Sequence, residues 1–111
     1  MPELPISADF YYAFEVTTPS GAIKPGLRDL QLAVSDTNTV PVTPVTPALI
    51  YPAPETSTSG LYATTIESSD MTAAFTEADI GRPVWLLVIE GVEIYGAEQF
   101  YIAMSPRLAP T

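Results

Sequence analysis

The stretch PVWLLVIEGVEIYGAEQFYIA, residues 83–103, decides the fold because it has the highest density of apolar residues in the chain. It predicts two β-strands joined by a tight turn at Glu90-Gly91, where the glycine can adopt positive φ. Residues 84–89 are almost all aliphatic or aromatic, which is typical of a strand buried on both faces. Gly96 interrupts the second strand and suggests a β-bulge or the approach of another backbone. Two apolar strands are not stable alone in water, so the rest of the chain must cover them.

Working outward, three further stretches alternate with the period of a strand. Residues 9–17 place Phe10, Tyr12, Phe14 and Val16 on one face, residues 27–34 place Leu30, Leu32 and Val34 inward and Asp29, Gln31 and Ala33 outward, and residues 60–67 place Tyr62, Thr64 and Ile66 together. Residues 48–51 predict a short edge strand, and Ser69 or Asp70 is expected to cap a helical turn over residues 71–75. Six or so short strands punctuated by glycine and proline predict an all-β fold, with a β-sandwich favoured over a small barrel.

Composition limits the function classes. The 111 residues fit one domain, and they include no cysteine and no histidine. This excludes a disulfide framework and a thiolate metal site, and it removes the commonest general base. Thirteen acidic residues against four basic ones give a formal charge of −9, so we expect no binding to nucleic acid or to anionic membranes.

Twelve prolines in 111 residues set the expected domain organisation. Residues 1–8 are predicted to be an extended N-terminal arm, residues 9–104 a β-sandwich with a Pro-rich loop at 36–60, and residues 105–111 an extended tail. Prolines at 41, 44 and 47 would line one edge of a polyproline II helix, which has three residues per turn. Three interpretations of this segment stay open: an exposed loop, an arm on a neighbouring subunit, or a ligand for a proline-recognising module.

Catalytic patterns are weak. Lys24 lies beside Pro25-Gly26 in an expected turn, which favours an exposed lysine over one that activates a serine. Glu90 and Glu93 flank the hairpin turn, and Asp70, Glu77 and Asp79 cluster before the hairpin. The first pair raises the question of a glycosidase and the second set that of a weak Ca²⁺ site, but turn capping and solubility account for both. We therefore predict a protein that is not an enzyme and that needs no metal or cofactor.

Aromatic residues supply the candidate binding groups. Tyr12 and Phe100 fit the inward-facing sets, so Tyr11 and Tyr101 are expected to face outward and could contact a sugar or a protein. Tyr62, two residues after Gly60, is placed like the tyrosine corner of Greek-key sandwiches. The residues predicted to bind partners are Val40, Val42, Val45, Leu49, Tyr51, Tyr11 and Tyr101.

Three stretches carry a resemblance to a known group of proteins. They are FYYAFEVTTPSGAIKPGLRDLQLAV (10–34), TSGLYATTIE (58–67) and TEADIGRPVWLLVIEGVEIYGAEQFYIA (76–103). Together they resemble the small immunoglobulin-like β-sandwich proteins of tailed-bacteriophage virions, in which a first strand, a Gly/Pro turn, a Gly-x-Tyr strand and an Asp-Ile-Gly turn precede a long C-terminal hairpin. The long proline segment is not part of that pattern, and no catalytic or ligand residue carries over.

The resemblance implies an immunoglobulin-like antiparallel β-sandwich with Pro-rich extended arms and one short helical turn. It also implies a non-enzymatic virion protein, a capsid-decoration, neck or tail component that binds other virion proteins and copies of itself as a homo-oligomer. The N-terminal sequence MPELPISADF has no cationic segment followed by an apolar run. We therefore expect a complete small gene product, made in the host cytoplasm and located in the virion. The alternative is a carbohydrate- or protein-binding sandwich module that uses outward aromatic residues such as Tyr11, Tyr51 and Tyr101.

Overall fold

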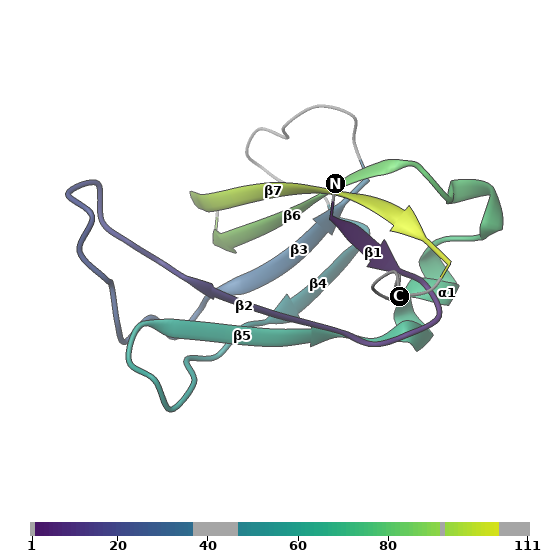
Figure 1. The fold of residues 1–111 in the computed structure, drawn as a ribbon. Helices are drawn as coiled ribbons and strands as arrows, with labels where there is room; N and C mark the ends of the chain where they lie inside the picture. The colour runs from purple at the N-terminus through teal and green to yellow at the C-terminus, as the bar shows by residue number, and fades with distance from the viewer. Residues whose placement is uncertain (1, 37–46, 92, 105–111) are drawn as a thin grey trace, which may run out of the picture.

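The computed structural model describes residues 2–36, 47–91 and 93–104 and is mostly β. Two sheets lie opposite each other (Figure 1). The larger has the strand order β1-β7-β6-β3-β4 and the smaller contains β2 and β5. The strands are β1 (Glu3–Pro5), β2 (Phe10–Glu15), β3 (Gln31–Ser35), β4 (Leu49–Pro52), β5 (Leu61–Ile66), β6 (Pro83–Glu90) and β7 (Glu93–Ala103). The expected all-β class is confirmed.

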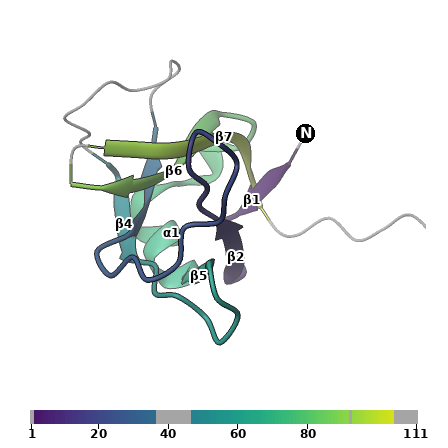
Figure 2. The ribbon, with the colours of Figure 1, turned by 90° about the vertical axis from the view of Figure 1, so that its left-hand side faces the viewer.

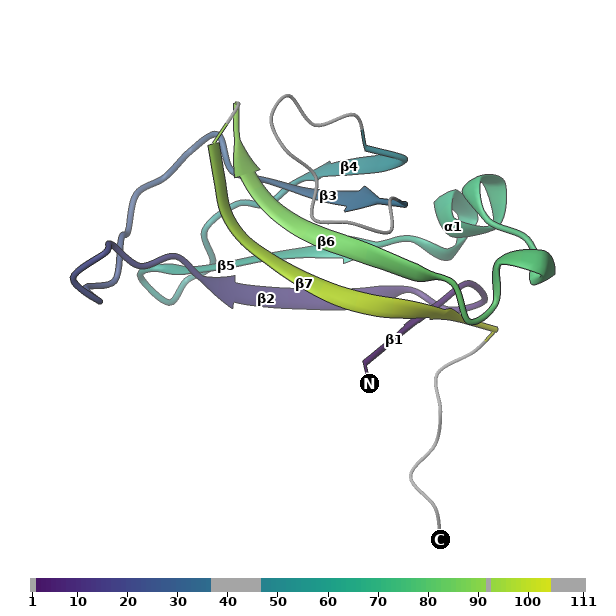
Figure 3. The same cartoon turned by 90° about the horizontal axis from the view of Figure 1, so that it is seen from above.

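The hairpin of β6 and β7 forms the middle of the larger sheet. β6 lies between β7 and β3 and pairs antiparallel with both. Gly91 in the turn has a φ of 60°, as the Glu90-Gly91 signal predicted. The register shifts between Val88 and Ile89, where Val88 faces Gly96 but Ile89 faces Ile94. The irregularity suggested by Gly96 therefore lies beside it, and both strands curve strongly there (Figure 3).

β6 is buried on both faces, as its unbroken apolar run predicted. Val84, Leu86 and Val88 join the main core between the two sheets. Leu87 and Ile89 lie on the opposite face with Ala33, in a second cluster to which Trp85 and Ile94 add partly buried side chains. Ala33 was expected to face outward, and it does point away from the main core, but it is fully buried because this second cluster surrounds it.

β2 and β5 alternate as their sequences predicted. Phe14 lies opposite Tyr62 and Tyr12 opposite Thr64, and these side chains face the larger sheet. Tyr62 and Ile66 are fully buried, whereas Phe10, Tyr12 and Phe14 pack against the core but remain partly exposed. The smaller sheet therefore contributes its buried side chains mainly from β5.

The connection from β5 to β6 contains the helix α1 (Ser68–Ala74) and the 3₁₀ turn η1 (Glu77–Asp79). Neither Ser69 nor Asp70 caps α1, contrary to prediction: the helix begins earlier, at Ser68, after Glu67. The first helical N–H, that of Ser68, donates instead to Asp9 Oδ1 at 2.9 Å. A carboxylate 59 residues earlier in the chain thus satisfies a helix N–H, where a local side chain was expected to cap the helix.

The N-terminal segment, which was expected to form an extended arm, contributes a strand to the larger sheet. β1 pairs parallel with the end of β7, from Glu3 opposite Tyr101 to Pro5 opposite Ala103. Leu4 and Ile6 lie in the main core. Before β2 the chain passes from the larger sheet to the smaller one (Figure 1).

β4 confirms the short edge strand expected near residues 48–51, because among residues 2–36, 47–91 and 93–104 it pairs with β3 alone, at the edge of the larger sheet. Most of the proline repeat and the predicted C-terminal tail lie outside the described residues. No helix in the described part of the chain is long and apolar enough to cross a membrane.

Candidate functional site

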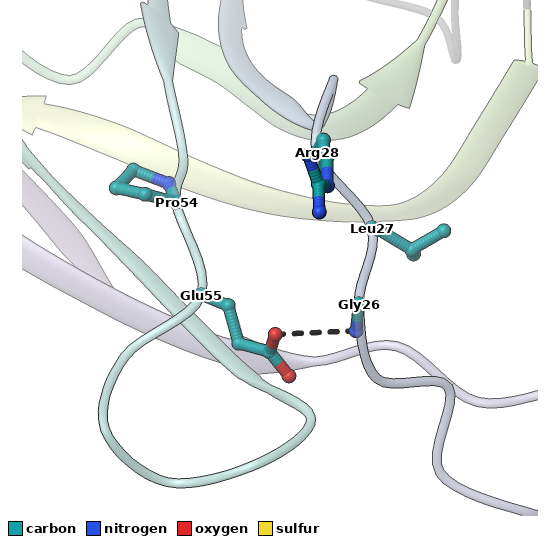
Figure 4. A pocket seen from close by; sticks show the side chains of 5 residues that line it. All are labelled: Gly26, Leu27, Arg28, Pro54 and Glu55. Carbon is teal, nitrogen blue, oxygen red and sulfur yellow. Dashed lines mark hydrogen bonds between the residues drawn. The ribbon is translucent and has the colours of Figure 1, made fainter.

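The loops at one end of the two sheets meet around an open hollow of 360 Å³. These loops follow β2 and β4 and face the viewer in Figure 2. The hollow is lined by Gly26, Leu27, Arg28, Pro54 and Glu55 (Figure 4). The lining segments carry a glycine and a proline, and the proline has no N–H to donate to a strand ladder. The hollow is a concave surface between two loops in the described part of the chain.

Glu55 holds this end of the molecule together. Its Oε1 accepts a hydrogen bond from Gly26 N at 3.2 Å, drawn in Figure 4, and its Oε2 accepts one from Gly60 N at 2.6 Å. Gly60 has a φ of +81°, and a Cβ placed on it would collide with Ile23. The carboxylate thus joins two loops through backbone donors, which makes it a structural group rather than a free acid.

Tyr62 fixes the same loop from beneath. Its hydroxyl donates to the carbonyl of Lys24 at 2.8 Å and accepts from Leu27 N at 3.0 Å. The ring is fully buried. Both functions of the hydroxyl are satisfied. Its partners lie 38 and 35 residues earlier in the chain rather than a few residues upstream, so the tyrosine corner expected from Gly60 and Tyr62 is not formed.

A second hollow of 300 Å³ adjoins the first and is lined by Arg28, Asp29, Leu30, Gln31, Pro52 and Gly91. Arg28 borders both hollows, and it is exposed. The ion pairs formed within the described residues belong to Arg82, with Asp36 and Asp79. Arg28 therefore gives this end of an acidic protein a cation that is available to a carboxylate.

Three tyrosine–carboxylate hydrogen bonds tie elements together elsewhere. Each tyrosine hydroxyl donates to a carboxylate: Tyr12 to Glu98 at 2.9 Å, Tyr51 to Asp70 at 2.6 Å, and Tyr95 to Glu90 at 2.9 Å. The first links β2 to β7, and the second links β4 to α1. Together they join the two sheets, join β4 to the helix, and join the two strands of the β6–β7 hairpin.

These contacts raise the pKa of all three tyrosines. Burial, followed by the hydrogen bond to the carboxylate, raises the pKa of Tyr12 and of Tyr51 to about 12. The hydrogen bond to Glu90, followed by burial, raises the pKa of Tyr95 to about 12. In each case ionisation would place a phenolate against a carboxylate, so the neutral tyrosine is favoured.

Two of the three carboxylates considered for metal binding, Asp70 and Asp79, are engaged in other contacts. Asp70 accepts from Tyr51, and Asp79 accepts from Thr76 N at 2.9 Å and from Arg82. The hydrogen bond from Thr76 N and the neighbouring Arg82 hold the pKa of Asp79 below its usual value. Within the described residues, no group of three or more acidic side chains is arranged to hold a metal ion.

Of the residues predicted to bind partners, the four that the structure describes do not gather at one place. Tyr11 on β2 is 64% exposed, while Tyr51 on β4 is half-buried against the main core and was expected to face outward. Tyr101 on β7 is half-buried between β1 and β6, opposite Glu3 and Pro83, and Leu49 packs on the main core. Val40, Val42 and Val45 lie outside the described residues. A shared aromatic platform of Tyr11, Tyr51 and Tyr101 is therefore not formed.

Sequence reasoning missed Arg28, Glu55 and Glu98. Arg28 and Glu55 lie in turns of ordinary polar composition, and nothing local indicates that residues 27 positions apart face one hollow. The local signal that could have indicated Glu55 is Gly60, because a glycine at the end of a polar turn leaves a backbone N–H that can donate to a nearby carboxylate.

No protein-family model, curated protein or solved structure matches this chain. The function of the protein must therefore be argued from its own residues and their geometry.

Proposed function

We propose that the chain is a non-enzymatic structural protein of a tailed-phage virion, which binds neighbouring copies of itself and other virion proteins. The virion is proposed from the resemblance of residues 10–34, 58–67 and 76–103 to small decoration, neck and tail proteins. The binding role is proposed from the fold and from the surfaces described above.

The observation that carries the proposal is the strand order. Variable-type immunoglobulin sandwiches place strands G, F, C and C′ in one sheet and include B and E in the other. Here β7-β6-β3-β4 takes the first order and β2-β5 the second, with β1 parallel to β7 at the edge. This correspondence supports an immunoglobulin-like sandwich, an architecture that serves many binding roles by varying its edges and loops.

The chemistry of the described residues supports a binding role over catalysis. The sequence has no histidine and no cysteine. The one glutamate that lines the 360 Å³ hollow, Glu55, already accepts hydrogen bonds on both oxygens. A nucleophile paired with a base, or two facing carboxylates, would be needed for acyl or glycosyl transfer.

Light scattering after size-exclusion chromatography, with amide exchange on the same sample, tests this proposal. We expect either a ring or other multimer, or a monomer that assembles and gains amide protection when a partner is added. A monomer that neither assembles nor gains protection with any partner would count against an assembly component. Screening against glycans would then test the alternative, a carbohydrate-binding module.

A further inference from the structure

The two edges of the smaller sheet differ. On the outer side of β5 the chain after β4 continues the sheet: Ala63 N donates to the Pro54 carbonyl at 3.2 Å, and Thr56 N donates to the Leu61 carbonyl at 2.7 Å. Glu55 forms a bridge with Tyr62 in the same register. On the outer side of β2, no described residue pairs with the strand. Among the residues that the structure describes, the β2 edge is thus the open edge of this sheet.

The inward aromatic side chains of β2 leave apolar surface uncovered along the open edge of the strand. Phe10, Tyr12 and Phe14 point toward the larger sheet and contact one another, with ring centroids 6.3 and 5.7 Å apart. Phe10 and Tyr12 also pack edge-on against Phe100. All three stay partly exposed because β2 has a neighbouring strand on one side only. An added strand would cover the remaining apolar surface.

The larger sheet is also uncovered on this side. β1 pairs with β7 only from Tyr101 to Ala103, so the earlier part of β7 is an edge among the described residues. Gly96 and Glu98, which face the same side as the main core, are exposed. A strand placed beside β2 would lie over this part of β7 and complete the smaller sheet.

The acidic residues around the open edge of β2 favour a strand that carries basic side chains. Asp9 and Glu15 lie at the two ends of β2 and Glu98 lies beside Tyr12, all three exposed. Neither β2, β5 nor β7 contains a lysine or arginine. Asp9 and Glu15 belong to the outward set of Tyr11 and Ala13, so outward side chains of an added strand meet negative charge. Its inward side chains meet aromatic rings and Glu98, which already accepts a hydrogen bond from Tyr12.

We propose that the open edge of β2 binds an extended segment of a partner protein by β-augmentation, and that this segment alternates apolar residues with lysine or arginine. Main-chain hydrogen bonds to β2 supply affinity, and the alternation supplies specificity. A second copy of the chain is a poorer occupant, because β2 carries acidic residues at its own ends and would bring like charges together. The inference rests on the proposed binding role and names the partner surface.

A peptide of about the length of β2, alternating valine with lysine and arginine, tests the proposal on the full chain. The control peptide keeps the valines and replaces each basic residue by glutamate. We expect the basic peptide to bind at least about tenfold more tightly, more weakly at high salt, and to shift the amide resonances of β2. No binding, equal binding of the two peptides, or shifts confined to β4 would overturn the proposal.

Two matched variants separate strand addition from general attraction to an acidic protein. Ala13→Lys and Thr65→Lys change the net charge equally, at exposed positions on the same face of the smaller sheet. Ala13 lies on the open strand, whereas Thr65 is one strand, about 4.8 Å, farther away. We expect Ala13→Lys to weaken peptide binding about fivefold or more, and Thr65→Lys by less than about twofold.

Equal effects of the two lysines would mean non-specific attraction and would overturn the proposal. A stable dimer whose interface maps to β2 would also overturn it, because a second copy would then be the occupant, although the assembly function would stand. Conversely, peptide binding at β2 by a chain that never assembles would leave the inference intact and count against the virion function.

Discussion

β6 and β2 have similar apolar content and very different burial. β6 has strands on both sides and side chains packed on both faces, so Leu86 is 1% exposed and Leu87 is fully buried. β2 has a strand on one side, and its aromatic residues remain partly exposed although they point to the same core. The difference shows that side-chain hydrophobicity alone does not set how far a residue is buried here.

The largest effect is expected from truncating β6. Leu86→Ala removes a fully packed side chain from between the sheets and should cost about 2–5 kcal/mol in the free energy of unfolding. Urea denaturation followed by Trp85 fluorescence measures it. Phe14→Ala on β2 removes a larger side chain from a half-exposed site, and we expect it to cost clearly less. Equal costs would show that β2 is as tightly packed as β6.

Tyr62→Phe tests the buried anchor of the smaller sheet. The change keeps the ring but removes the hydroxyl, which leaves the Lys24 carbonyl and Leu27 N without their partner. We expect a cost of about 1–3 kcal/mol in unfolding free energy and faster amide exchange at Leu27. Tyr101→Phe serves as the control, since its hydroxyl forms no hydrogen bond with a loop in the described part of the chain. If Tyr62→Phe were neutral, the Tyr62 hydroxyl would not be what holds the loop.

Tyr12→Phe removes the latch between β2 and β7 and should cost about 1 kcal/mol or less, because the contact is exposed. The pKa of Tyr12 is about 12 in the folded protein against an ordinary value of 10.0. The contribution of the neutral tyrosine is therefore complete below pH 10 and is lost as the pH rises from about 10 to 12. Across this pH range the unfolding temperature should fall less steeply for Tyr12→Phe than for the wild type. Identical slopes would mean that the latch does not form in solution.

Tyr11→Ser should have the smallest effect on stability, within about 0.5 kcal/mol, because the side chain is 64% exposed and outside the core. Chemical denaturation of the two proteins side by side measures the change. A loss above about 1 kcal/mol would place Tyr11 in a packed environment and would remove the contrast between the faces of β2.

Much of the fold followed from local patterns. The period of two in residues 9–17 and 60–67 predicted which side chains face inward, because successive strand residues point to opposite faces. Glu90-Gly91 predicted the hairpin turn, since glycine adopts the required positive φ. The site was much less predictable: Arg28 and Glu55 become neighbours only when two loops from different sheets meet.

The sequence by itself determined the all-β class, the alternating faces, the terminal hairpin and its irregularity near Gly96, because each depends on residues adjacent in the chain. Tertiary structure alone decided that Asp9 satisfies the start of α1, that β1 runs parallel to β7, and that β5 is covered while β2 is open. Each of these depends on which distant segments become neighbours, and local periodicity carries no information about that choice.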